Sequence, residues 1–266
     1  MQSYSLSWPA ARSRSRTGGV IALPTAALLS LDGHLDEATA LQLLTQLKVL
    51  PSEVEDLAAA VLRIRIGGGS LGAAQAVAEG LDTLRTELGI PIVGLVIETA
   101  LSAGFFAALA CDHVVASPAA SLGGCGAIVR RLSIDRLLAR IGVSYQPITS
   151  GLLKDNLFPL NALEAQQEED LKGLVSDHLA QFMSFVRIRR AVDTAVLDQI
   201  SEGQIFSGIK ALDLGLIDEN GAMFAALTAA GRLSSVDTLR VQAVSSDSSN
   251  SAESSLIEGI TSFLTR

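Results

Sequence analysis

The sequence predicts an α/β protein built around a mainly parallel β-sheet. Short apolar runs rich in valine and isoleucine alternate along the chain with longer segments in which leucine and alanine recur at helical spacing. Such alternation is typical of strands joined by helical crossovers, which pair in parallel. The predicted strands cover residues 20–23, 60–66, 91–97, 113–116 and 144–148, and the main predicted helices cover residues 36–47, 73–87, 133–141 and 164–190.

The composition bounds both the domain organisation and the class of partner. With 266 residues, 48% of them hydrophobic, the chain is long enough for one large domain, which we expect over residues 19–240. Residues 1–18 are predicted to be a disordered arm, and residues 241–266 a serine-rich linker followed by a short amphipathic segment. The net charge of −8 argues against a nucleic-acid partner.

Neither a transmembrane segment nor a metal site is expected. The longest apolar runs fall short of the about 20 residues that span a bilayer. The two cysteines, Cys111 and Cys125, are too few for a disulfide framework or a metal cage, and they fit a reducing compartment. We therefore expect a cytoplasmic protein without metal or cofactor, with peripheral membrane association left open.

Ser102 is the first candidate for chemistry. It stands between the strand-like run 91–97 and an apolar, alanine-rich run that predicts a buried helix. A hydroxyl at such a turn lies close to the N–H groups that start the helix, which suits a nucleophile beside its oxyanion donors. The same position also suits an ordinary N-cap serine.

A nucleophilic serine needs a base, and lysine is the better candidate here. The three histidines lie in a turn, at a strand start and within a long polar helix, so none supports a Ser-His-Asp triad. Among the four lysines, Lys154 follows a predicted strand and Ser150, with Leu152, Leu153, Leu157 and Phe158 nearby, so its desolvation is plausible. A surface lysine whose stem covers apolar neighbours is the alternative.

Three consecutive glycines, residues 67–69, follow the predicted strand 60–66. Glycine lets backbone N–H groups face a site without side-chain obstruction, as an oxyanion hole requires. The spacing matches neither G-x-G-x-x-G nor a P-loop, so phosphate binding is not indicated. A plain turn is the alternative.

Four segments together resemble the signal peptide peptidase A (SppA) family of Ser-Lys proteases, which includes phage head-maturation proteases. VLRIRIGGGS at 61–70 is similar to the family's VLRINSPGGS, and ALSAGFFAALACD at 100–112 to its AASGGYYIACAAD. SGLLKD at 150–155 is similar to SGKYKD, and IFSGIKALDLGLIDE at 205–219 to VYTGRQALELGLVDE. The resemblance covers about residues 19–225 and implies a Clp-protease/crotonase-like fold, a repeated ββα superhelix.

The resemblance assigns the site. It implies a serine endopeptidase with Ser102 as nucleophile and Lys154, 52 positions later, as general base. Gly69 and Ala103 would supply the oxyanion hole, with Gly68 and Ser150 in support. The family's Asn-Ser-Pro before its glycines is replaced by Arg65, Ile66 and Gly67 in this chain, and Cys125 stands in a segment near the site.

Several biological versions stay open at this point. The substrate is a peptide or protein, and the resemblance implies a homo-oligomer with sites near subunit interfaces. A phage head protease would act on capsid or scaffold proteins, whereas a soluble signal-peptide-peptidase-like enzyme would not. A catalytically impaired interaction protein on the same scaffold is an alternative, and a crotonase-type acyl-CoA enzyme ranks last.

Overall fold

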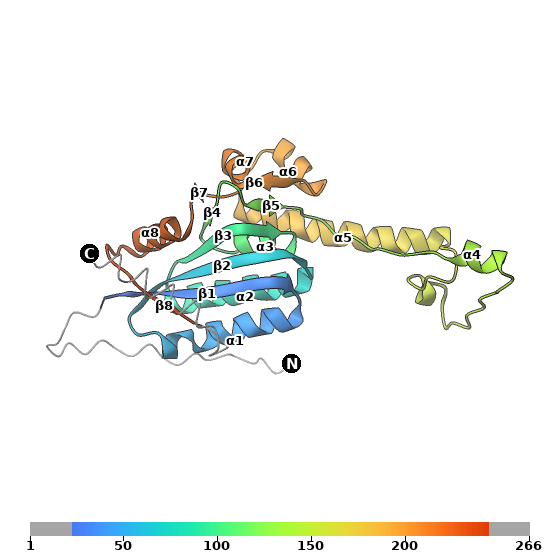
Figure 1. The fold of residues 1–266 in the computed structure, drawn as a ribbon, viewed down its shortest axis with the longest axis horizontal. Coiled ribbons are helices and arrows are strands. Elements are labelled where there is room, and N and C mark those ends of the chain that lie inside the picture. Colours follow the sequence, from blue (N-terminus) through green and yellow to red (C-terminus); the bar gives the residue numbers. More distant parts are fainter. Residues whose placement is uncertain (1–22, 245–266) are drawn as a thin grey trace. The chain divides into compact units, whose positions relative to one another are not determined.

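A computed structural model describes residues 23–244 of the chain. The predicted arm 1–18, nearly all of the predicted strand 20–23 and the segment 245–266 lie outside the described residues. Within residues 23–244 the protein is a mixed α/β structure in which one sheet carries helices on both faces (Figure 1). The predicted fold class is confirmed.

The sheet is mainly parallel. Its order within the described chain is β6-β5-β3-β2-β1-β8, with β4 beside β3 and β7 beside β4, and only the β5–β6 pair among these is antiparallel. The strands are β1 (Thr25–Leu35), β2 (Leu57–Gly69), β3 (Ile92–Leu101), β4 (His113–Ala116), β5 (Ser121–Gly123), β6 (Ile205–Ser207), β7 (Glu219–Asn220) and β8 (Arg240–Ala243).

The helices begin where short polar side chains accept backbone N–H groups. Asp36 caps the first long helix through Thr39 N at 2.9 Å, and Ser70 caps the second through Ala73 N. The helices are α1 (Glu37–Glu53), α2 (Leu71–Leu88), α3 (Ala103–Leu109), α4 (Asp135–Arg140), α5 (Ala165–Arg189), α6 (Thr194–Ser201), α7 (Gly208–Asp213) and α8 (Met223–Ser234), with a 3₁₀ helix η1 (Leu152–Asp155).

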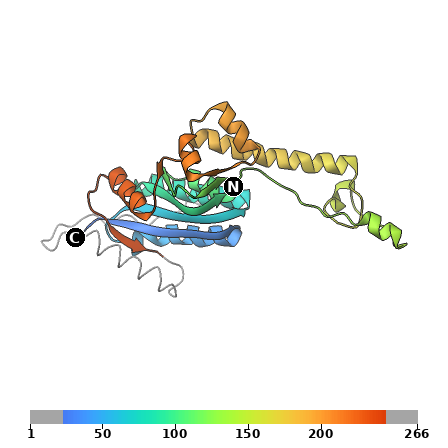
Figure 2. The same ribbon diagram turned by 45° about the horizontal axis from the view of Figure 1, so that its top comes forward.

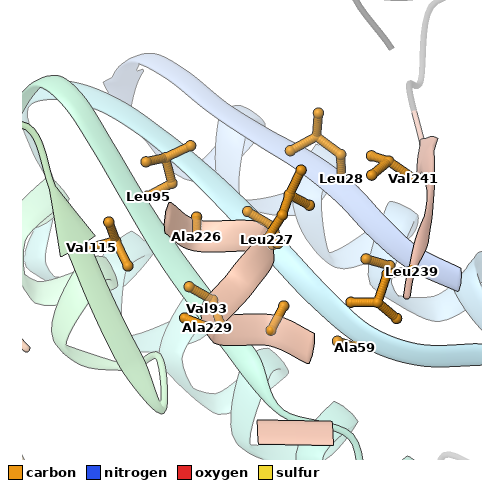
Figure 3. Packing of buried hydrophobic residues seen from close by; sticks show 13 residues of the cluster. Leu28, Ala59, Val93, Leu95, Val115, Ala226, Leu227, Ala229, Leu239 and Val241 are labelled. Carbon is orange, nitrogen blue, oxygen red and sulfur yellow. The ribbon is translucent and has the colours of Figure 1, made fainter. Parts of the chain in front are cut away.

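The core lies on both faces of the central strands. Helices α1 and α2 lie along one side of the sheet and α8 along the other (Figure 2). On α8, Leu227 and Ala229 belong to one buried apolar cluster with Val93, Leu95 and Val115 of the sheet, all of them at most 6% exposed (Figure 3). These apolar contacts bind α8 to β2, β3 and β4, so the strands that lead to Ser102 are buried on both faces.

The structure also differs from the predictions. Strand β2 continues through Gly69, so the three glycines expected to follow the strand belong to it, and the plain-turn alternative is wrong. The described chain has no strand at residues 144–148, because no neighbouring strand pairs with them. The sequence analysis missed α6, α8 and β8. It also missed β1, a strand that contains His34, which was expected in a turn.

The described chain forms two compact units. The first contains the sheet and its covering helices, up to Cys125 and again from Phe185 onward, and the second is Gly126–Ser184. Within residues 23–244, no helix combines the length and apolar character needed to cross a membrane.

The second unit exposes many large apolar side chains. It consists of α4, η1, the residues of α5 up to Ser184 and irregular connections. Its exposed large hydrophobic residues are Ile128, Leu132, Leu137, Ile141, Val143, Ile148, Leu152, Leu153, Leu157, Phe158 and Leu174. Where such side chains form a large contiguous patch, the patch commonly marks a site of interaction with another molecule.

Candidate active site

Ser102 has an unusual backbone conformation at the junction of β3 and α3. Its φ is 51° and its ψ is −115°, outside the regions that L-residues commonly adopt. Its hydroxyl makes no capping hydrogen bond to α3, so the N-cap alternative is not what the structure shows. Strain of this kind costs about 1–3 kcal/mol and concentrates at functional sites.

Neighbouring strands hold Ser102 in this conformation. Its N–H donates to the carbonyl of Gly123 at 2.7 Å, and its carbonyl accepts from Phe106 N at 3.0 Å. The first bond continues the β3–β5 ladder, in which Leu101 pairs with Gly123. Strand β5 holds the N–H of Ser102 and helix α3 holds its carbonyl, so the backbone of this residue is fixed on both sides. Its side chain is only half-buried.

Position 104, two residues after Ser102, has no room for a side chain. A Cβ atom on Gly104 would lie 2.6 Å from the Cβ of Ile66 and 2.8 Å from the Ile66 carbonyl oxygen. Every residue of α3 is buried, so the helix packs directly onto β2. The glycine therefore brings the start of α3 against the strand that ends in the glycine run.

The glycine run lies beside Ser102. Ile66 pairs with Ala100 across β2 and β3, so Gly68 and Ser102 stand two residues beyond paired positions. Gly69 approaches β1 so closely that its Cβ would be 2.2 Å from the Leu35 carbonyl oxygen, and Gly68 has a φ of 153° that other residues rarely adopt. The structure thus brings Gly68, Gly69, Ser102 and Ala103 together at the carboxyl ends of neighbouring strands.

Arg65 stands two positions before the glycine run, where the resembling family has asparagine, and its side chain is bound to the neighbouring strand. Its Nε lies 3.1 Å from the Asp32 carboxylate, and Arg63 lies 2.9 Å from the same carboxylate. The β1–β2 pairing continues past Arg65 to Gly69. The arginine therefore leaves the glycine strand paired and ordered.

Neither cysteine is placed to act as a nucleophile. Cys111 and Cys125 are both free and buried. Burial raises the pKa of the Cys111 thiol to about 12, and burial likewise raises the pKa of Cys125. Both thiols stay protonated near neutral pH, so neither is suited to nucleophilic attack.

His113 lies at the wrong end of the sheet to serve as the base. It pairs with Val93 at the amino end of β3, whereas Ser102 follows the carboxyl end, a separation of about 30 Å at the rise of a strand. Its imidazole Nε2 instead lies 3.4 Å from Glu219 and 3.4 Å from Arg232. Within residues 23–244, no cluster of three or more metal-ligating side chains is found.

Lys154 lies in the second unit, on η1, and its side chain is exposed. The predicted apolar surroundings are wrong for the single chain, because Leu152, Leu153, Leu157 and Phe158 are 39–59% exposed. Ser150 is exposed as well. Ser102 and Lys154 belong to different compact units, so their pairing stays a prediction.

Two supporting residues were missed from the sequence alone. Gly104 fixes the packing of α3, and Gly123 accepts the Ser102 N–H. The first is visible as the glycine of the Ser-Ala-Gly motif. The second is the last residue of β5, a short strand of small residues whose pairing with β3 is evident only in the fold.

A strained serine between strand and helix, beside a glycine-rich strand end on a parallel sheet, is an arrangement typical of serine hydrolases. The family model for peptidase family S49 matches residues 85–237 of this sequence, which is more than half of the chain. The chain belongs to peptidase family S49 and is a serine peptidase.

Named relatives agree with this assignment. A protein of Synechocystis sp. that is named as the protease slr0021 is 30% identical to this chain, over 81% of this chain and 76% of its own length. A protein of Enterococcus faecium named for signal peptide peptidase SppA is 27% identical over 67% of this chain and 51% of its own length.

Solved structures agree on the fold. Two mutant structures of the 1510-N membrane-bound stomatin-specific protease, one in complex with a substrate peptide, each superpose with a TM-score of 0.58. They cover 85% and 90% of this chain and all of their own, at 13% and 14% identity. At this identity the likeness shows a shared Clp/crotonase-like fold.

Proposed function

We propose that the protein is an endopeptidase that cleaves peptide bonds with a Ser102–Lys154 dyad through an acyl-enzyme. The observation that carries the proposal is the backbone of Ser102, whose φ of 51° persists because β5 and α3 hold it. Enzymes commonly present a nucleophilic serine on such a strained strand-to-helix turn. An ordinary capping serine needs no such conformation.

In the proposed reaction, neutral Lys154 accepts the hydroxyl proton while Ser102 Oγ attacks the substrate carbonyl carbon. The N–H groups of Ala103 and Gly69 stabilise the resulting oxyanion, with Gly68 shaping the strand end. The Lys154 ammonium then protonates the leaving amine, and the ester remains on Ser102. Lys154 next takes a proton from water, whose oxygen attacks the ester; the lysine returns this proton to Ser102 Oγ as the acid leaves, which restores the free enzyme. Ser150 supports the lysine turn.

The protein acts as a homo-oligomer in this proposal. Exposed apolar side chains of residues 126–184 flank Lys154 on both sides in the sequence. They suit burial against a second copy of the chain. Such a cover would exclude water from the lysine and favour its neutral form. Assembly would then complete an active site that a single chain leaves open to solvent.

The substrate is a peptide segment with apolar side chains. The E. faecium relative is named for signal peptide peptidase, and the structural neighbour acts on stomatin by its title. These cellular relatives favour the signal-peptide-peptidase version over the phage version. Two free, buried cysteines suit a reducing compartment, so we place the activity in the cytoplasm. Capsid and portal genes beside the coding sequence would reverse the choice.

Peptide cleavage by the purified full chain tests the proposal. Fluorogenic apolar peptides should be hydrolysed by the wild type and by Lys48→Ala, a control at an exposed lysine of α1. Ser102→Ala and Lys154→Ala should each lower kcat by at least about 1,000-fold. Cleavage by Ser102→Ala at the wild-type rate would overturn the proposed nucleophile.

A further inference from the structure

Gln167 is a polar side chain buried within the second unit. It is 3% exposed, while its neighbours Gln166 and Glu168 on α5 are exposed. An amide removed from water costs free energy unless its oxygen and nitrogen both find partners. Its burial therefore points to specific hydrogen bonds.

Both ends of this amide are used. The Oε1 atom accepts from the Glu164 N–H at 3.0 Å, which is the backward half of a capping box at the start of α5. The Nε2 atom donates to the Leu152 carbonyl at 2.8 Å. One side chain thus joins the first turn of α5 to a segment 15 positions earlier in the chain.

The segment that it holds is η1, the turn that carries Lys154. The Leu152 carbonyl is two residues before the lysine, and the Lys154 N–H donates to Gly151 O at 3.1 Å. On the other side of the lysine, Asn156 Nδ2 lies 3.4 Å from the Asp170 carboxylate, one turn further along α5. Contacts with α5 therefore flank Lys154 on both sides.

We propose that Gln167 is a positioning residue that fixes the turn bearing the general base Lys154. The inference rests on the proposed dyad. The two partners, one a donor and one an acceptor, require a neutral amide of this length. Glutamate keeps the bond from Glu164 N–H but offers no donor to Leu152 O. Leucine loses both bonds.

Acylation kinetics of the full-length protein with a fluorophosphonate probe tests this role. Gln167→Glu and Gln167→Leu should lower the acylation rate constant per titratable site roughly 10- to 100-fold, because small displacements of a catalytic group are costly. KM for a peptide should change little while kcat falls. The matched controls Gln166→Glu and Gln166→Leu, at the exposed neighbour, should acylate at the wild-type rate.

Amide hydrogen exchange separates positioning from general damage. Residues 151–158 should exchange several-fold faster in both Gln167 variants and remain unchanged in the Gln166 variants. The midpoint of the pH–rate profile should also shift, since the lysine changes its surroundings.

The contrary outcomes are distinct. If Lys154→Ala inactivates the protein but both Gln167 variants acylate at the wild-type rate, the positioning role is overturned and the proposed dyad is kept. A lower fraction of active sites with an unchanged rate constant would also overturn it, because Gln167 would then serve folding only. A fully active Lys154→Ala protein would instead remove the proposed dyad, whatever the exchange data show.

Discussion

Ser102 and Lys154 are held in opposite ways. Ser102 starts α3, whose residues are all buried, and main-chain hydrogen bonds from a strand and a helix fix its backbone. Lys154 sits on a 3₁₀ turn without a buried residue, held by the side chains of Gln167 and Asn156. The proposed nucleophile is thus placed by the core and the proposed base by a few polar contacts.

We infer from this difference that the proposed serine half of the site forms with the fold of one chain, whereas the proposed lysine half needs a cover from a second copy. Apolar packing is cooperative and leaves little freedom, so the strand end with Ser102 is rigid. Exposed leucine and phenylalanine side chains around residue 154 supply no such packing within one chain. Substitutions in the two regions should therefore have different effects.

The largest difference should appear between two phenylalanines. Phe105 is 0% exposed on α3, and Phe158 is 44% exposed near Lys154. Phe105→Ala should lower the free energy of unfolding by about 4 kcal/mol because it leaves a cavity in the core. Phe158→Ala should lower it by less than about 1 kcal/mol. Denaturant unfolding of both variants measures the contrast, and equal losses would contradict it.

Gly104→Ala should have the next largest effect. The added methyl would meet Ile66 at 2.6 Å and push α3 from β2, lowering the free energy of unfolding by about 2 kcal/mol. Fluorophosphonate labelling of Ser102 should slow as well. Gly72→Ala is the matched control, since its methyl would meet Ser70 Oγ at 3.7 Å, an ordinary contact. Thermal melting of both variants decides the matter, and equal melting temperatures would refute the packing argument.

Asp218 gives the first unit a dependence on pH. Burial raises the pKa of Asp218, but hydrogen bonds from Arg190 and from the Val114 N–H outweigh it, so its pKa lies below the ordinary 3.8. A depressed pKa stabilises the folded state above pH 4, and this contribution is lost as the pH falls through the folded-state value. Asp218→Asn should cost about 1.5 kcal/mol at pH 7 and less at pH 3. Unfolding curves at both pH values measure this, and a pH-independent loss would contradict the assignment.

The smallest effect on stability should come from Ile148. Its side chain is fully exposed, so Ile148→Ser should change the free energy of unfolding by less than about 0.5 kcal/mol. The same substitution should weaken self-association, because it removes apolar area from the surface that we propose a second copy covers. Ile188→Ser is the control, since Ile188 is 75% exposed but lies outside residues 126–184. Native mass spectrometry measures assembly, and an unchanged oligomer would argue against this interface.

The sequence predicted the central part of the fold well. Residues 60–66, 91–97 and 113–116 are strands because their β-branched runs are buried on both faces, and such runs carry a strong signal. The helices at 73–87 and 164–190 are confirmed within one to two residues, since both have long amphipathic or well-capped sequences. Strand extensions such as Gly67–Gly69 depend on a neighbouring strand, so local preference does not reveal them.

Of the site, the grouping of Ser102 with the glycines follows from motif and spacing, whereas the pairing of Ser102 with Lys154 stays a prediction. Motif and spacing pointed to Ser102 and the glycines, and the fold brings them together. The expected burial of Lys154 failed because apolar neighbours in sequence are not neighbours in a packed core. The role of Gln167 has no local signature, since glutamine is common on polar helices and its partner Leu152 O is a backbone atom.

Fluorophosphonate labelling with mass-spectrometric mapping tests the central claim most directly. We predict that the wild-type protein is modified on Ser102 and that Lys154→Ala is modified at least about 1,000-fold more slowly while remaining folded. Labelling at another residue, or labelling of Ser102 that is independent of Lys154, would contradict the dyad.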